Sequence, residues 1–185
     1  LMSCYLMTKK KSYAFVIVLL LGLSPVYAQG YRKLSSNDFQ GKPKSNDPYL
    51  SYTKLRIGYS STATKRDGNY LLTFHVYLDI NKAESWMKFD KISNQKTFIA
   101  LLNHEQGHFK IGALMQQELM HRLNAKRYSS HYKQEAATIF NKVAAKYHLL
   151  QTQYDQETRH MMDIEKQGQW DEKLDKSLSE HGILP

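Results

Sequence analysis

Alternating apolar and polar residues predict two β-strands in the first half of the chain. Every second residue from Tyr70 to Ile80 is apolar, and a shorter alternation covers residues 55–59. A strand places successive side chains on opposite faces, so both stretches are typical of half-buried strands. The link between them contains Asp67-Gly68, a dipeptide that favours a tight turn. We therefore expect an antiparallel hairpin.

In the second half the apolar residues recur at three- and four-residue steps, which predicts helices. One pattern runs from about Asn94 to Lys126 without a proline, and Asn94 is a suitable N-cap. A second pattern covers residues 132–165. A short helix is expected at residues 170–178 and a third short strand at residues 85–89. The predicted fold class is α+β, a small antiparallel sheet followed by two long helices.

The first 28 residues have the features of a cleavable signal peptide. Three lysines at residues 9–11 precede an apolar run at residues 13–23, and Val26-Tyr27-Ala28 has small residues where a signal peptidase needs them. The apolar run is shorter than the roughly 20 residues of a spanning helix. An uncleaved N-terminal anchor is the alternative. We expect a secreted or periplasmic protein without a stable membrane anchor, in which residues 29–185 form one domain.

Composition excludes several kinds of chemistry. The only cysteine, Cys4, precedes the apolar run, so the mature chain has neither disulfides nor a cysteine nucleophile nor a cysteine-type zinc site. Without the three leader lysines, 23 basic residues stand against 17 acidic ones. These basic residues are scattered along the sequence. With neither a basic stripe nor a recognition motif, nucleic-acid binding is not expected.

The segment His104-Glu105-Gln106-Gly107-His108 lies within the first predicted helix. Residues four apart share a helix face, so His104 and His108 can reach one ion, with Glu105 beside them as a general base. The alternative is a polar cluster on an ordinary amphipathic helix. We expect a Zn²⁺ site because both histidines lie among apolar residues in an exported chain.

A catalytic zinc needs a third protein ligand and one open position. The metzincin spacing places glycine and histidine at positions that hold Ile111 and Leu114 here, so that pattern fails. His121 lies too far along the same helix axis. The candidates come from the second helix and remain open at this stage; they are Asp155, Glu157 and His160.

Several motifs together resemble a bacterial family of predicted secreted zinc-dependent proteases, domain-of-unknown-function family 922. They are HEQGHF, the later YDQETRH segment, Gln167/Gln169-Trp170, Ser85-Trp86 and the stretch LSSNDFQGKP at residues 34–43. The resemblance implies a zincin-like fold. It implies His104, His108 and His160 as zinc ligands, Glu105 as catalytic base, and Tyr154, Asp155 and Thr158 near the site. This chain departs from the family at Ser36, usually tryptophan, and at Met161, usually glycine.

We therefore expect a zinc-dependent metallopeptidase that acts on peptide or protein, including cell-wall peptide. Zinc would polarise the scissile carbonyl while Glu105 moves the proton. Tyr154 is a candidate oxyanion donor, with a buried core tyrosine as the alternative. The rival function is a non-catalytic, zinc-stabilised binding or structural module of the cell envelope. Glu105 argues against the rival, because a structural site does not need a base.

Overall fold

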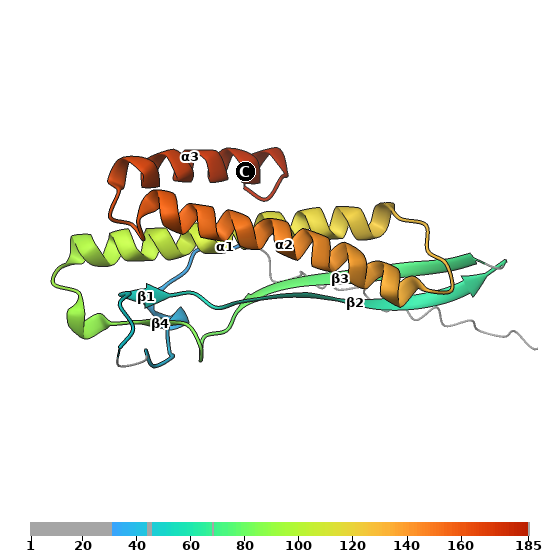
Figure 1. Ribbon diagram of the computed structural model, residues 1–185, viewed down its shortest axis with the longest axis horizontal. Helices are drawn as coiled ribbons and strands as arrows, with labels where there is room; N and C mark the ends of the chain where they lie inside the picture. The colour runs from blue at the N-terminus through green and yellow to red at the C-terminus, as the bar shows by residue number, and fades with distance from the viewer. Residues whose placement is uncertain (1–30, 44–45, 68, 185) are drawn as a thin grey trace, which may run out of the picture.

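Two long helices lie against one face of a long β-hairpin, and a third, shorter helix lies over them on the side away from the hairpin (Figure 1). The structure is a computed structural model that describes residues 31–43, 46–67 and 69–184. The expected α+β class is confirmed, with two two-stranded antiparallel sheets and three helices. The predicted signal peptide lies outside the described residues. No helix in the described part is long and apolar enough to span a membrane.

The expected hairpin is formed by β2 (Leu55–Arg66) and β3 (Asn69–Ile80), paired without a break from Leu55↔Ile80 to Arg66↔Asn69. Both strands continue further into the link than the alternation predicted. The half of the hairpin nearest the helices buries Val76, Leu78 and Ile80. Only the end of the hairpin projects past the helices, towards the right of Figure 1, and β2 is exposed from Ser60 onwards.

The third predicted strand exists but does not join the hairpin. It is β4 (Trp86–Met87), and it pairs with β1 (Ser51–Tyr52). The pairing is extended by two further bonds, from the Lys88 backbone N–H to the Leu50 carbonyl (2.8 Å) and from the Lys54 backbone N–H to Ser85 Oγ (2.9 Å). This small sheet holds the chain around β1 beside the first helix.

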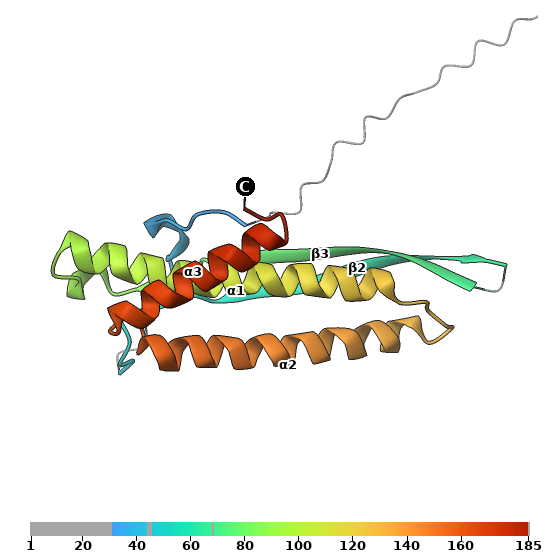
Figure 2. The same ribbon diagram turned by 90° about the horizontal axis from the view of Figure 1, so that it is seen from above.

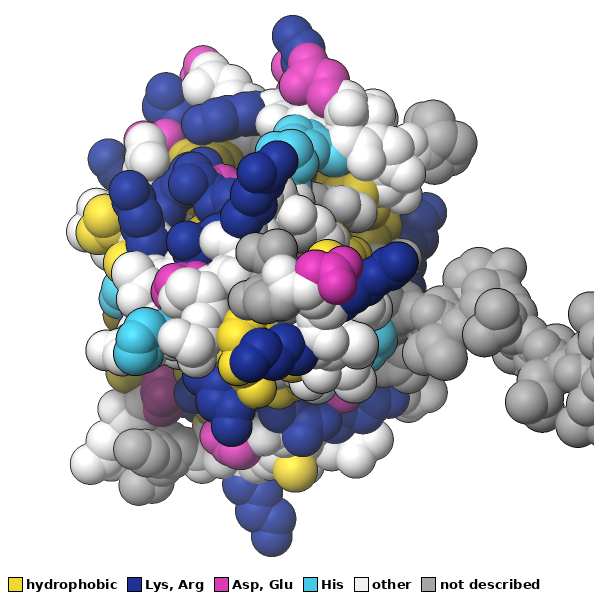
Figure 3. All heavy atoms as spheres, turned by 90° about the vertical axis from the view of Figure 1, so that its right-hand side faces the viewer, with side chains coloured by type: hydrophobic (Ala, Val, Ile, Leu, Met, Phe, Trp, Pro, Cys, Tyr) yellow, Lys and Arg dark blue, Asp and Glu magenta, His cyan; other side chains and the backbone are white. Residues whose placement is uncertain are grey.

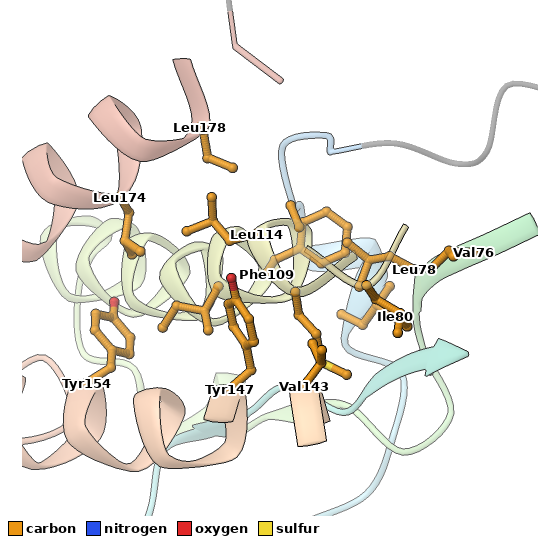
Figure 4. Close-up of a cluster of buried hydrophobic side chains, with 14 of the residues drawn as sticks. Val76, Leu78, Ile80, Phe109, Leu114, Val143, Tyr147, Tyr154, Leu174 and Leu178 are labelled. Atoms are coloured by element: carbon orange, nitrogen blue, oxygen red, sulfur yellow. The ribbon is translucent and has the colours of Figure 1, made fainter. Parts of the chain in front are cut away.

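Helix α1 (Gln95–Ala125) begins where the sequence predicts, because the Asn94 side chain accepts a bond from the Thr97 N–H (2.9 Å). Helix α2 (Tyr132–Thr158) returns antiparallel to it, and α3 (Ile164–Glu180) crosses α1 on its outer side (Figure 2). Apolar side chains from all three helices and β3 meet in one core (Figure 4). Two short 3-10 helices, Ser36–Asp38 and Phe89–Lys91, complete the fold.

The prediction that the second helix continues to residue 165 is wrong. Helix α2 ends at Thr158, and Arg159, His160 and Met161 follow with φ of 49°, 51° and 75°. A right-handed helix cannot contain such residues, and the left-handed region costs a residue with a Cβ roughly 1–2 kcal/mol. The His160 N–H bonds back to the Asp155 carbonyl (3.1 Å). His160 therefore lies beyond the helix, on a turn.

Candidate metal centre

Two helices bring together the three side chains that can hold a metal. His104 and His108 lie one turn apart on the face of α1 that packs against α2, and Asp155 faces them from α2. Asp155 Oδ1 is 3.2 Å from His104 Nε2 and 3.0 Å from His108 Nε2. Zinc ligands at 2.0–2.1 Å in a tetrahedral shell lie roughly 3.3 Å from one another. Both distances from Asp155 are compatible with such an ion, and the three possible ligand atoms all lie within 4.8 Å of one another.

The outer nitrogen of each imidazole faces a glutamine. His104 Nδ1 is 3.1 Å from Gln167 Oε1, and His108 Nδ1 contacts Gln151 Oε1. The Gln151 amide nitrogen donates to the His108 carbonyl (3.0 Å), so its oxygen faces the ring. Because an amide oxygen only accepts, each Nδ1 carries a proton and each Nε2 of a neutral ring presents a lone pair.

Three electron-rich atoms therefore converge, two Nε2 lone pairs and a carboxylate oxygen. Such a group is stable only with a cation among its members, either protons on the imidazoles or a metal ion. Burial lowers the pKa of His108, but the hydrogen bond and charge of Asp155 and the charge of Glu105 outweigh burial and raise it. Burial likewise raises the pKa of Asp155, and its bonds to His104 and His108 hold it well below the usual range. Two imidazoles and a carboxylate form a donor set that zinc accepts.

Glu105, on α1, lies next to His104 in the chain and is buried beside this cluster. Its side chain is only 2% exposed, and its Oε2 atom has no hydrogen-bond partner among the described residues. A buried carboxylate without a partner is costly, so a group that donates to it is expected at this position. Glu105 lines the cleft described below, where a donor can approach.

The three candidates for a third ligand have different surroundings. Asp155 lies inside the cluster, and His160 Nδ1 is 3.3 Å from Asp155 Oδ1 with 45% of its side chain exposed. Glu157 faces away, because it accepts bonds from Trp170 Nε1 (2.8 Å) and Gln153 Nε2 (2.7 Å). The structure thus places Asp155 and His160 together at the site and Glu157 at the α2–α3 interface.

Tyr154 is fully buried and does not line the cleft. Its hydroxyl donates to the His104 carbonyl (3.0 Å) and accepts from Gln167 Nε2 (2.8 Å), which turns the amide oxygen of Gln167 towards His104. Its ring stacks on His104 at a centroid distance of 4.8 Å, and burial raises its pKa far above the usual value. Thr158, also buried, donates to the Tyr154 carbonyl (2.7 Å). This placement supports a role in positioning His104 and does not support the oxyanion-donor hypothesis.

A cleft of about 730 Å³ opens between the two helices and the segment around β1. Its lining includes His104, His108 and Asp155 together with Glu105. Apolar side chains line much of its wall, Lys54 and Arg159 lie at its border, and the Tyr49 ring packs 4.3 Å from that of His160. Thr53 Oγ1, which is buried without a hydrogen-bond partner among the described residues, belongs to a residue of the same wall.

Sequence reasoning missed Gln151 and gave Gln167 no role. The signal for Gln151 is its position one turn before Asp155, on the face of α2 that must point at α1. Gln167 offers no comparable signal, because its contact with His104 depends on how α3 crosses the other helices.

A family model described as a bacterial protein of unknown function, DUF922, matches residues 27–161. No curated protein and no solved structure matches the chain. The family match ends before α3, although Gln167 on α3 contacts His104.

Proposed function

We propose a catalytic function for this chain, which belongs to the DUF922 family of bacterial proteins of unknown function. It is a secreted or periplasmic zinc-dependent peptidase. The observation that carries the proposal is the position of Glu105, a buried carboxylate with a partnerless oxygen, in the lining of a cleft and beside two imidazoles and a carboxylate. A purely structural metal site has no need of such a group.

Each side chain of the site has a separate role in the proposed reaction. His104, His108 and Asp155 would hold the ion, with His160 at the rim, and zinc bound there would supply a Lewis acid that polarises a carbonyl and makes water more acidic. Glu105 accepts the proton of the attacking water and delivers it to the leaving amine. Gln151 and Gln167 hold both imidazoles in the tautomer that presents Nε2.

A peptide substrate is supported by the wall of the cleft around β1. Within the described residues β1 pairs only with β4, so its other edge carries unpaired backbone groups. Its residues line the cleft, and an extended peptide can add to such an edge while the partnerless Thr53 Oγ1 bonds to its backbone. The apolar positions Leu50, Leu55 and Leu101 would receive apolar side chains.

The test uses residues 29–185. We expect about one zinc per chain by metal analysis, as for one mononuclear site. The Glu105→Gln variant should keep its zinc and fold but lose about 10²–10⁴-fold in peptide cleavage, because the proton acceptor is gone. The matched control is Glu172→Gln, which alters an exposed side chain on α3 and should leave activity unchanged. A fully active Glu105→Gln variant would exclude the mechanism.

The rival function, a zinc-stabilised structural module, is favoured by the closeness of His160 to Asp155. If all four side chains bind the ion, the shell is closed and no position is open. The zinc affinities of the single variants Asp155→Ala, His160→Ala and Glu157→Ala show which of these side chains bind the ion. We expect Asp155→Ala to match His104→Ala and Glu157→Ala to match the parent. When Co²⁺ replaces zinc, an added hydroxamate can bind the ion and change its visible spectrum only if one coordination position is open.

A further inference from the structure

Folding gathers the net charge of the described chain at one end. We call residues 60–75 and 117–148, which comprise the outer hairpin and the halves of α1 and α2 beside it, the basic end. It contains eight lysines and arginines against three acids, whereas the remaining described residues contain fourteen of each. Figure 3 views the molecule from this side and shows Lys and Arg side chains over much of the surface. The basic residues that look scattered along the sequence are thus clustered in space.

The acids at the basic end do not neutralise it. Glu118 pairs with both Arg122 and Lys146, and Glu135 pairs with Lys126 at 3.6 Å. The third acid, Asp67, lies 3.8 Å from Arg66. Four exposed cations of the basic end form no ion pair with a described residue; they are Lys65, Arg127, Lys133 and Lys142.

Part of the basic end is concave. A groove of about 950 Å³ lies between α1 and α2 and is separate from the catalytic cleft. Arg122 and Lys126 line it from α1, and Lys142 and Lys146 line it from α2. Each pair is four residues apart, so the charges repeat about every 6 Å along each helix. With Glu118 as the one acid among its lining residues, the groove carries a net charge of +3.

The hairpin and the helices are fixed to each other at this end. The turn between α1 and α2 forms a β-bridge to the hairpin, Tyr70↔Tyr128, and the ring of Tyr132 packs 5.3 Å from that of Tyr70. The cations Arg127 and Lys133 adjoin these tyrosines in the chain. The outer hairpin therefore adds its charge to the same end of the molecule, although the groove itself is lined by residues of α1 and α2 and by His181.

We propose that the basic end binds a linear polyanion, a chain of phosphate or carboxylate groups without aromatic bases. Two cations along each side of a groove, with further exposed cations at the same end of the molecule, suit repeated charges along a flexible polymer. A flat lipid surface cannot enter a groove between helices. Single-stranded nucleic acid stacks its bases on exposed aromatic rings, whereas Tyr147, the only aromatic residue that lines the groove apart from the two histidines, is 7% exposed.

The test compares two variants of residues 29–185 with equal loss of charge. The first carries Lys65→Gln, Arg127→Gln, Lys133→Gln and Lys142→Gln at the basic end. The control carries Lys33→Gln, Lys42→Gln, Lys96→Gln and Lys176→Gln elsewhere. All eight side chains are exposed, so both variants should fold as the parent does.

The probes are linear polyphosphate and polygalacturonate, measured against salt concentration. We expect the parent to bind at least one of them, with affinity that falls as salt rises because bound counterions are released. The basic-end variant should bind at least tenfold more weakly and with a smaller salt slope, and the control should bind as the parent does. Equal weakening in both variants would show an effect of net charge alone and overturn the proposal.

Two further probes identify the class of partner. A mixed-sequence single-stranded oligonucleotide and anionic phosphatidylglycerol vesicles should both bind more weakly than the better polyanion. Tighter binding of the oligonucleotide or of the vesicles would assign the basic end to nucleic acid or membrane and overturn the proposal. The proposal would also be overturned if neither polyphosphate nor polygalacturonate bound at low salt. Peptide cleavage by the basic-end variant serves as the folding control.

Discussion

Gln167 decides which nitrogen of His104 carries the proton, although it does not line the cleft. Replacing it with methionine, of similar shape, removes the acceptor for Nδ1–H, so the ring can adopt the wrong tautomer. We expect Gln167→Met to weaken zinc binding about 10–100-fold, the usual cost of losing the partner of a ligand histidine. Competition with a chelating dye measures this.

Gln167→Glu supplies the matched comparison, since a carboxylate also accepts from Nδ1. It should bind zinc more tightly than Gln167→Met, although its second oxygen replaces an amide nitrogen that donates to Asp171 (2.9 Å). A second control, Gln169→Met, removes an exposed amide on the same helix and should change nothing. If all three variants bind zinc equally, Gln167 has no positioning role.

How far the sequence predicts the site depends on the distance over which each contact acts. His104, Glu105 and His108 follow from helix periodicity alone, because all three lie on two turns of one helix. Asp155 emerged only as one of three candidates, since its selection requires the rotation of α2 against α1. Gln151 depends on the same rotation of α2, whereas Gln167 also requires the path of α3. Local spacing therefore predicts that the two histidines share a helix face, and tertiary packing brings Asp155 to them.

Among the helices, α1 and α2 approach closely where α1 carries Gly107. A Cβ on Gly107 would lie 2.1 Å from Tyr154 Oη and 2.5 Å from Cζ. Tyr154 is fully buried with both hydroxyl bonds fixed, so it cannot move aside. We expect Gly107→Ala to lower the free energy of unfolding by about 1–3 kcal/mol through overpacking, despite alanine's higher helix propensity.

Gly168 on α3 provides the control, because a Cβ there would meet nothing within 4 Å. Gly168→Ala should raise the free energy of unfolding by about 0.5–1 kcal/mol through helix propensity alone. Urea unfolding measures both variants. Opposite signs confirm that the helix approach, rather than backbone freedom, requires glycine at position 107, and equal signs contradict it.

The segment before β1 is fixed through one buried carboxylate, Asp38. Burial would raise its pKa, but bonds from Arg32, the Ser35 N–H and Lys82 lower it well below the usual range. A lowered folded pKa stabilises the protein above the unfolded value of about 3.9 and loses that contribution as pH falls. Asp38→Asn should thus be less stable than the parent at pH 7, with the difference shrinking below about pH 4. Urea unfolding at pH 7 and pH 3 tests this.

The elements show the same limit of local prediction as the site. The hairpin and α1 follow from alternation, the Asp-Gly turn and the Asn94 cap, all of which act within a few residues. The end of α2 was missed because Arg159, His160 and Met161 contain neither glycine nor proline, the usual signals of a helix end. Only the surrounding contacts hold them in the left-handed region. The pairing of β4 with β1 was equally hidden, since two-residue strands have no measurable period.

At the scale of the whole molecule, the metal would link α1 to α2 across 51 residues of chain between His104 and Asp155. A ligand that binds only the folded state adds its binding free energy to stability, about 2.7 kcal/mol at 100 times its dissociation constant. Removing zinc by chelation should lower the melting temperature by roughly 5–10 °C for a chain of this length. Scanning calorimetry with and without added zinc tests this. A His104→Ala, His108→Ala double variant should melt at the same temperature in both conditions.

The uneven distribution of charge also makes the molecule an electric dipole, with its positive pole at the basic end. The cleft that contains Glu105 is lined by other parts of α1 and α2 and lies nearer the opposite end. In the field of an anionic polymer or surface, a dipole experiences a torque as well as an attraction. The protein would therefore rotate as it approaches, within about one Debye length of 8–10 Å, and arrive with the basic end first. The cleft, at the opposite end, would then lie away from the polymer or surface before any specific contact has formed.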